Sequence, residues 1–521
     1  MATIYDAFDT NYRLDYYGIT VNQHWRDNIA RWLYYSDSYH GGNDYRAGRY
    51  LTKYYLESAD EYENRVKQTP LDNHCKSVVE TYNSFLFRTP PKRTYGSIEN
   101  DPALESFFQD ADLDGRTFNQ FMRDVATQSS IYGNVWVMVD RPNTQVATRA
   151  DELQQEIRPY VIMFTPENVI DWEYTRRMSG AYELTYIKIY EGADDDYGYY
   201  REITPENISV YRKNRGAMEN DAPDLLEQYP NALQKVPCVP VYAQRSRLRG
   251  VGISDISDIS DMQRAVYNEL SELEQIVRIS NHPSLVKTSD TEAAAGAGAI
   301  IDLPNDLDAN LKPYLLEPSG SGIDNILSSL DNKANAINRM ANLGGTRSTA
   351  TRTMSGVALE TEFQILNARL SEKADLLELA EEQIWRLWSQ WQGKVWDGMI
   401  DYPDSFNIHD KANTIELLKK SKETKPENAK LLEEIDHQLA NALVKDEDRL
   451  AEIKEAQEET AVMPSQPLQT QMQHPPMTNP SDMIAHMREM LEQGYTNEQI
   501  MELHPEISQF FSNQNGGNDD A

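Results

Sequence analysis

The spacing of apolar positions divides the chain into a helical start, a strand-rich middle and a helical second half. In the first 90 residues, apolar and aromatic side chains recur at helical spacing, as in His24–Tyr35 and Val78–Phe87. The period changes to two at Val135–Asp140, which predicts a strand. Further strands are predicted at Arg158–Thr165, Tyr182–Tyr190, Tyr199–Ile203, Ile208–Arg212 and Val236–Tyr242. Residues 100–245 are therefore expected to form an α+β region with a mostly antiparallel sheet.

The pattern then turns helical, and a first long helix is predicted over residues 254–280. Ser254 is a suitable N-cap. The helix should end near His282-Pro283, because the residue before proline avoids the α conformation. An apolar stripe follows its length: Ile256, Ile259, Val266, Leu270, Leu273 and Val277.

Two more long helices are predicted beyond an irregular patch at Ser284–Pro318. The second helix spans Ile323–Leu343. The third runs from Ser355 to about Gln392, with apolar residues alternately four and three apart over nearly five heptads. Lys373 interrupts this stripe, so a helix packed on the core is favoured over an isolated coiled coil.

The last quarter of the chain is polar. Residues 411–460 predict polar helices, and Asp446–Glu459 contains seven acids and two bases. Residues 461–480 hold five Pro and four Gln, a composition typical of a linker. Ser481–Phe511 predicts a small helical module, followed by a frayed tail.

Composition narrows the class of protein. The 521 residues have a formal net charge of −33, so a broad basic surface that holds duplex DNA is not expected. At 40% hydrophobic, the chain can bury sizeable cores in about three or four domains. Two cysteines, Cys75 and Cys238, exclude a disulfide scaffold and fit a reducing compartment. No apolar run reaches 18 residues and the acidic first residues do not form a signal peptide, so no membrane contact is expected.

Signatures of catalysis are missing from the sequence. It contains no GxxxxGK[ST] phosphate loop, no HExxH, no CxxC and no GxSxG motif. The nine histidines show no metal-ligand spacing. We therefore expect a protein that is not an enzyme, with no cofactor and no metal. A hydrolase or nuclease that uses carboxylates within residues 100–245 is kept as an alternative.

Two segments run against the acidic balance. One carries Arg245, Arg247 and Arg249 just before the first long helix. The other, Asn332–Leu359, contains no acid, and its four cations are Lys333, Arg339, Arg347 and Arg352. The first segment could be a loop whose arginines pair with nearby carboxylates, and the second a solvated loop between helices. A Gly-, Thr-, Ser- and Arg-rich loop at residues 344–354 could also bind phosphates without reading bases.

Several short strings occur in an order that resembles one family, the portal proteins of tailed bacteriophages. The resemblance covers about residues 40–405, and each string is modest by itself. The strings are Tyr50-Leu51, Glu61-Tyr62-Glu63-Asn64-Arg65, Leu71-Asp72-Asn73, Tyr132-Gly133-Asn134, Arg158-Pro159-Tyr160, Thr165-Pro166-Glu167-Asn168-Val169-Ile170-Asp171-Trp172, Gly252-Ile253-Ser254-Asp255-Ile256 and Ser355-Gly356-Val357-Ala358-Leu359.

The resemblance implies a portal-type α+β subunit with a helical and mostly antiparallel wing, two stem helices, a small α/β clip and a helical crown. The segments it implies, with the C-terminal ones added from composition, are a wing at 1–245, a first stem helix at 246–281, a clip at 282–318, a second stem helix at 319–343, a tunnel loop at 344–354, a long wing helix with a return strand at 355–405, a crown at 406–460, a linker at 461–480 and a C-terminal module with its tail at 481–521.

The resemblance also implies a function and partners. Such a subunit forms a twelve-membered ring at one capsid vertex of the virion, after assembly in the host cytoplasm. Double-stranded DNA passes through its channel, the terminase motor and later neck, adaptor and tail proteins dock on it, and capsid and scaffold proteins surround it. Arg347 and Arg352, with Arg339 and Lys333, would face the channel, and Arg245, Arg247 and Arg249 would form a basic cluster before the first stem helix.

A head component that never contacts DNA is the alternative within the same particle. The host, the identity of the partners, the ring count outside a capsid, and the roles of 446–459 and 481–511 are left open.

Overall fold

A computed structural model of the chain divides it into two units, residues 1–408 and 409–521. The described residues of the second unit are all helical, and Lys422 forms an ion pair with Asp436 there. The predicted crown, linker and C-terminal module otherwise lie outside the described residues, as do the first 18 residues and the loop 344–354. The structure describes residues 19–142, 155, 157–214, 216–218, 221–281, 284–286, 308, 314–316, 321–343, 356–406, 418–422, 432, 435–436, 438–440, 488 and 491.

The first unit begins with helices, as predicted, and their ends are capped by side chains. In α1 the backbone N–H of His24 donates to the Asn22 side chain at 2.8 Å. In α3 Ser58 and Glu61 cap each other's backbone N–H groups, which leaves fewer unpaired donors in the first turn. These helices are α1 (Gln23–His40), α2 (Gly42–Ala47), α3 (Ala59–Gln68) and α4 (His74–Leu86).

A three-stranded antiparallel sheet of order β3-β2-β9 forms the centre of the body. Its strands are β2 (Asn134–Asp140), β3 (Tyr160–Phe164) and β9 (Cys238–Tyr242), and α5 (Pro102–Gln109) and α6 (Phe118–Tyr132) precede them. All positions of β2 before Asp140 are buried, on both faces. Helices α6 and α11 (Gly356–Trp391) pack on the strand, and Trp136 lies against Trp172 of the second sheet at 6.1 Å between ring centroids. The alternation of side chains in the sequence therefore predicts this strand correctly, but neither face of the strand is exposed to solvent.

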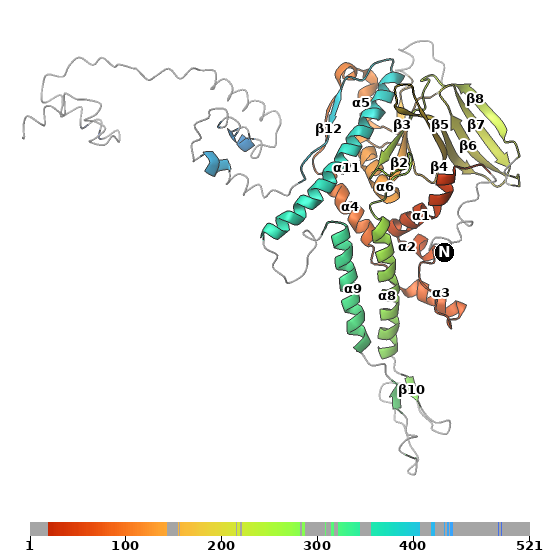
Figure 1. The fold of residues 1–521 in the computed structure, drawn as a ribbon, viewed down its shortest axis with the longest axis vertical. Helices are drawn as coiled ribbons and strands as arrows, with labels where there is room; N and C mark the ends of the chain where they lie inside the picture. Colours follow the sequence, from red (N-terminus) through yellow and green to blue (C-terminus); the bar gives the residue numbers. More distant parts are fainter. Residues whose placement is uncertain are drawn as a thin grey trace, which may run out of the picture. The chain divides into compact units, whose positions relative to one another are not determined.

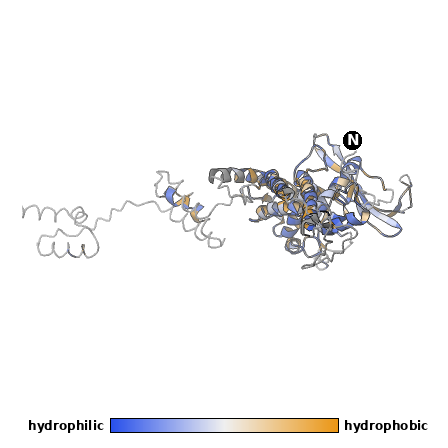
Figure 2. Cartoon of the chain, turned by 90° about the horizontal axis from the view of Figure 1, so that it is seen from below, coloured by the Kyte–Doolittle hydropathy of each residue, from blue (hydrophilic) through white to orange (hydrophobic). Residues whose placement is uncertain are grey.

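The second sheet is an antiparallel meander of five strands (Figure 1). It runs β4 (Val169–Arg176), β5 (Tyr182–Ala193), β6 (Tyr197–Ile203), β7 (Asn207–Asn214) and β8 (Asp224–Pro230). Its outer strands carry mostly hydrophilic and intermediate colours in Figure 2. The sequence predicts β5, β6 and β7 but not β8, since that edge strand is almost wholly exposed and lacks an apolar alternation. It also misses β4.

Helices α8 (Ser257–Asn281) and α9 (Ser321–Met340) lie side by side, as Figure 1 shows. Both confirm predicted helices, with ends shifted by a few residues. Strands β10 (Ser284–Val286) and β11 (Tyr314–Leu316) pair antiparallel between them. The predicted irregular patch thus starts and finishes in a small two-stranded sheet.

The long helix α11 (Gly356–Trp391) confirms the third predicted helix, and strand β12 (Met399–Asp401) follows it. Strand β12 pairs with β1 (Lys92–Thr94), which comes just before a short 3₁₀ turn at Gly96–Ile98. Arg93 of β1 donates to the buried Glu381 of α11 at 2.5 Å. Glu381 also accepts hydrogen bonds from Trp385 and Tyr402. Contacts between residues nearly 300 positions apart in the sequence therefore hold the first unit together.

Candidate functional site

The start of α8 is fixed by a close approach of two backbone segments, which we call the junction (residues 130–134 and 252–255). Gly133 has a φ of +92°, a conformation that favours glycine. A Cβ on Gly252 would lie 2.0 Å from the Gly133 carbonyl oxygen, so a larger residue does not fit there. The Gly252 N–H donates to the Asn134 side chain at 2.8 Å. Two of the strings that carry the family resemblance thus meet in space.

Ser254 belongs to the junction, and α8 begins at Ser257, two residues later than a Ser254 N-cap predicts. The Ser254 hydroxyl still accepts a hydrogen bond from the Ile256 N–H at 3.2 Å in the turn before the helix. It also donates to the Ile131 carbonyl at 2.6 Å, and the Asp255 N–H donates to the Ser130 carbonyl at 3.0 Å. The segment before α8 is therefore bound to the last turn of α6.

Asp255 places a carboxylate inside the protein at this point. It forms ion pairs with Lys373 and Arg369 of α11, and the distance to Arg369 is 3.3 Å. The Lys373 ammonium also donates to the Ser130 hydroxyl at 3.2 Å. Burial by itself would raise the pKa of Asp255, but the two cations outweigh it and hold that pKa below its ordinary value. The cation that interrupts the apolar stripe of α11 thus pairs with an acid at the start of α8.

The α8–α9 pair is held by an apolar seam and one polar cluster. Leu270 of α8 and Leu330 of α9 pack against the core. Lys333 of α9 forms an ion pair with Glu269 of α8, and Ser329 donates to the same carboxylate at 3.0 Å. Toward the far end of α8, Val277 remains 37% exposed. Its own chain therefore does not cover the whole apolar stripe of this helix.

Helix α9 ends in a Schellman motif at Asn342, earlier than the predicted Leu343. Asn342 has a φ of +56°, which asparagine tolerates better than most residues. The Leu343 N–H donates to the Asn338 carbonyl at 2.8 Å, and the Asn342 N–H donates to the Arg339 carbonyl at 3.1 Å. Leu343 is fully buried. Hydrogen bonds therefore fix the C-terminal end of α9 as far as Leu343.

The four cations predicted to face a channel differ in burial and in ion pairing where the structure describes them. Lys333 is half-buried and paired across the α8–α9 seam. Arg339, in the last turn of α9, is exposed. Arg347 and Arg352 lie outside the described residues. The structure thus describes one exposed member of this group.

The basic cluster Arg245, Arg247 and Arg249 is exposed on the loop that leads to the junction. Among the described residues, no carboxylate lies within ion-pair distance of any of the three. The Arg249 guanidinium lies 3.7 Å from the ring centroid of Tyr182 instead. The loop backbone is fixed by Trp172, which donates to the Arg249 carbonyl at 2.9 Å.

A hollow of about 350 Å³ lies beside this basic cluster. Side chains from β4, β5, β9 and α11 line it, among them Tyr174, Tyr182, Tyr242 and Gln383. The hollow combines cations with aromatic rings and contains no acid, so it could accept an anionic group rather than carry out acid–base catalysis.

Residues that the sequence did not identify complete the site. Arg369 and Asp255 were not predicted as a pair with Lys373, although a lone lysine in an apolar stripe was a usable signal. Within the described part of the chain, no group of three His, Cys, Asp or Glu side chains is placed to hold a metal ion. None of the described helices is both long and apolar enough to span a membrane.

Comparisons with known proteins find no match by sequence and weak similarity to solved structures. No family model matches the chain, and no curated protein matches it. Among solved structures, a chain from the neck of an empty GTA particle computed with C6 symmetry is similar with a TM-score of 0.39 and 9% identity, covering 73% of this chain and 93% of that chain. A chain from the virion of a native gene transfer agent particle has a TM-score of 0.38 and 9% identity, covering 68% and 86%. Likenesses at this level do not establish a shared fold.

Proposed function

We propose that the protein is the subunit of a portal ring at one vertex of a phage-type capsid, through which double-stranded DNA is packaged and ejected. The observation that carries the proposal is the charge contrast along the second half of the chain. The whole chain has a net charge of −33, yet Asn332–Leu359 contains four cations and no acid. This stretch begins within α9 and continues into the Gly-, Thr-, Ser- and Arg-rich sequence 344–354.

The charge contrast suits a channel for DNA. A ring that passes DNA must let it slide, and an acidic lumen repels phosphates. A few arginines on a loop, such as Arg347 and Arg352, then give brief contacts that do not depend on base sequence. In this proposal Arg339, Arg347 and Arg352 face the channel, while Lys333 contributes to the α8–α9 seam.

The order of elements supports the same proposal. Along the chain, a region of helices and antiparallel sheets is followed by α8, the β10–β11 strand pair, α9 and the long α11. In the proposed ring α8 and α9 are the stem, and residues 282–318 with β10 and β11 form the clip on which terminase and then neck and adaptor proteins dock. Capsid and scaffold proteins surround the body. A ring of head-to-tail copies closes on itself and requires two different contact surfaces on each subunit.

Electron microscopy of the purified protein, combined with light scattering, tests the proposal. We expect rings with a central hole and a mass about twelve times the 59.7 kDa of the subunit. A uniform monomer or dimer that forms no ring even when mixed with capsid and scaffold proteins would contradict it.

A further inference from the structure

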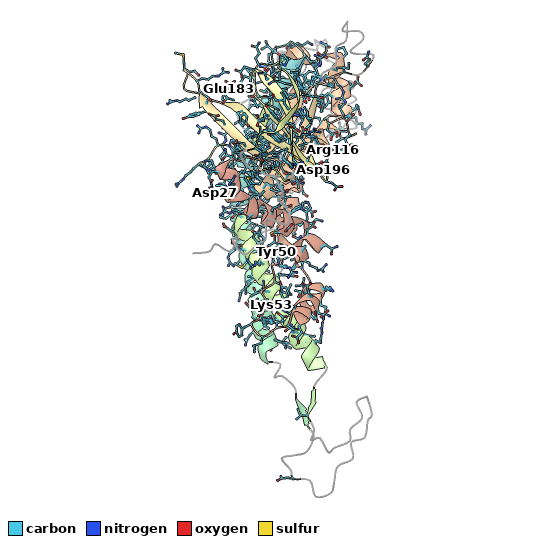
Figure 3. The ribbon with its side chains drawn as sticks, turned by 90° about the vertical axis from the view of Figure 1, so that its right-hand side faces the viewer. Asp27, Tyr50, Lys53, Arg116, Glu183 and Asp196 are labelled. Atoms are coloured by element: carbon cyan, nitrogen blue, oxygen red, sulfur yellow. The ribbon has the colours of Figure 1, made fainter. Side chains whose placement is uncertain are left out.

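The segment between α2 and α3 exposes two large side chains to an unusual degree. Tyr55 is 99% exposed and Leu56 is 90% exposed. Large apolar side chains that stand fully in water next to each other mark a contact surface more often than isolated ones do. The neighbouring Lys53 is exposed as well, and Figure 3 shows it along the helix pair. We call Lys53, Tyr55 and Leu56 the tip.

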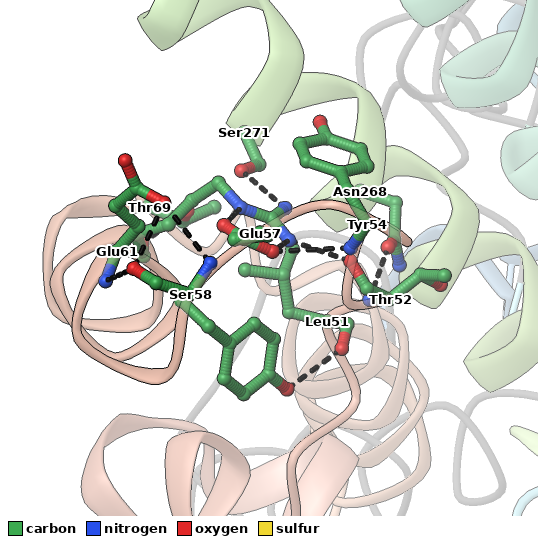
Figure 4. A network of polar contacts seen from close by, with 11 residues as sticks. Leu51, Thr52, Tyr54, Glu57, Ser58, Glu61, Thr69, Asn268 and Ser271 are labelled. Carbon is green, nitrogen blue, oxygen red and sulfur yellow. Dashed lines mark hydrogen bonds and ion pairs between the residues drawn. The ribbon is translucent and has the colours of Figure 1, made fainter.

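The backbone that carries the tip is held rigidly on α8 (Figure 4). The Thr52 N–H donates to the Asn268 side chain at 2.8 Å. Arg65 donates to Glu57 at 2.7 Å, to the Thr52 carbonyl at 2.6 Å and to Ser271 at 3.2 Å. The network thus fixes both sides of the tip to one helix. A rigid contact surface loses little conformational entropy when it binds.

The network also determines the side of α8 on which the tip lies. At about 100° per residue, Ser271 lies about 160° around α8 from Glu269, the residue that pairs with α9, and Asn268 lies about 100° from it on the same side as Ser271. Figure 1 accordingly shows α3 and α9 on opposite sides of α8. The tip of one chain therefore cannot cover the outer side of α9 in the same chain.

The outer side of α9 carries a complementary row of side chains. Asp324, Leu327 and Asp331 are spaced three and four residues apart, so they share one face of the helix. Leu327 is 46% exposed and both aspartates are exposed. Among the described residues, no cation pairs with either aspartate and no acid forms an ion pair with Lys53. The row thus has one apolar position between two negative charges, and the tip has two apolar residues beside one positive charge.

We infer that the tip binds the Asp324–Leu327–Asp331 row of α9 in a second copy of this chain. The inference rests on the proposed ring and names the contact that closes it. Because the two surfaces differ and lie on opposite sides of the same helix pair, each copy can bind one neighbour through each surface. Tyr55 and Leu56 then pack on Leu327, and Lys53 lies near Asp331.

Disulfide cross-linking tests this contact on the full-length chain. The native Cys75 and Cys238 are buried, and burial raises the pKa of both thiols, so they stay protonated and unreactive. We expect a Tyr55→Cys chain mixed with a Leu327→Cys chain to give a covalent dimer under mild oxidation. A chain with both substitutions should give a ladder of covalent oligomers. As the matched control, Met178→Cys, at a side chain that is fully exposed on the turn between β4 and β5, should not link to Tyr55→Cys.

Charge exchange gives a second readout that does not depend on oxidation. Lys53→Glu should raise the subunit concentration at which rings dissociate by about tenfold, which corresponds to about 1.4 kcal/mol per contact. Lys53→Glu combined with Asp331→Lys should restore most of the loss. Both side chains are exposed, so folding should not change.

The outcomes separate this inference from the proposed function. Rings of normal mass that show neither cross-link nor charge rescue would overturn the contact and leave the portal proposal intact. A wild-type chain that forms no ring with capsid and scaffold proteins present would overturn both.

Discussion

Lys373, in the middle of α11, forms an ion pair with Asp255 at the start of α8, and both side chains are buried. The pair joins the longest helix of the body to the helix pair that the proposed function places in the stem. Because 118 positions separate the two residues, the contact fixes the relative position of elements that the chain order alone does not define.

Removing one partner of this pair should be severe. Lys373→Met leaves a carboxylate buried without its main counter-ion, and we expect the free energy of unfolding to fall by about 3–5 kcal/mol. Urea titration of tryptophan fluorescence measures it. Adding Asp255→Asn should recover a large part of the loss. Arg386→Met, which removes an exposed ion pair with Glu382, is the control and should change stability by less than about 1 kcal/mol. Equal effects of the two single variants would contradict the assignment.

The same pair predicts a dependence of stability on pH. The pKa of Asp255 is lower in the folded protein than in the unfolded chain, so its ion pairs stabilise the fold fully above the unfolded value of about 3.9. This contribution is lost as pH falls below that value and through the folded pKa. The Asp255→Asn variant should therefore lose less stability than the wild type between about pH 5 and pH 2. Parallel acid-unfolding curves for the two proteins would show that Asp255 is not responsible.

Gly252→Ala should disturb the junction strongly. The added Cβ would meet the backbone of Gly133, which no rotamer change can move aside, so we expect a loss of about 3 kcal/mol or a failure to accumulate folded protein. Thermal melting and soluble yield are the measurements. Gly322→Ala, where nothing lies within 4 Å of the new Cβ, is the matched control and should be neutral or slightly stabilising.

Arg347→Ala combined with Arg352→Ala should reduce the packaging or retention of DNA and leave ring assembly unchanged. Each arginine lost removes a contact to phosphate and lowers the salt dependence of binding, so the difference between the variant and the wild type should be largest at low salt and shrink as the salt concentration rises. Nuclease-protected DNA per particle and ring mass are measured together. Loss of the ring would assign the two residues a structural role, and normal DNA content would remove them from the channel.

Much of the secondary structure could be predicted from the sequence, because it depends on local periodicity. Strands β5, β6 and β7 alternate in polarity, and α8, α9 and α11 carry helical stripes. The exposed edge strand β8 has no such alternation and was missed.

The site was harder to predict, because its contacts join distant positions. Ser254 has a residue type suited to an N-cap, yet its hydroxyl binds the end of α6, which no local pattern reveals. Lys373 was noticed as an interruption, but nothing in the sequence identifies Asp255 as its partner. An apolar pair in a short loop, such as Tyr55 and Leu56, carries no periodic signal, so the sequence does not predict its exposure.

The contacts that Glu381 and β12 make with β1 have a consequence for synthesis on the ribosome. Arg93 and β1 are made early, but their partners Glu381 and Met399–Asp401 emerge about 300 residues later. Asp255 is likewise synthesised before its ion-pair partner Lys373. A nascent chain that stops before Lys373 therefore lacks the partners of Asp255, Arg93 and β1, and the charges and the strand edge left unpaired favour aggregation and capture by chaperones. Chains truncated before Lys373 should therefore be removed before they reach the proposed ring.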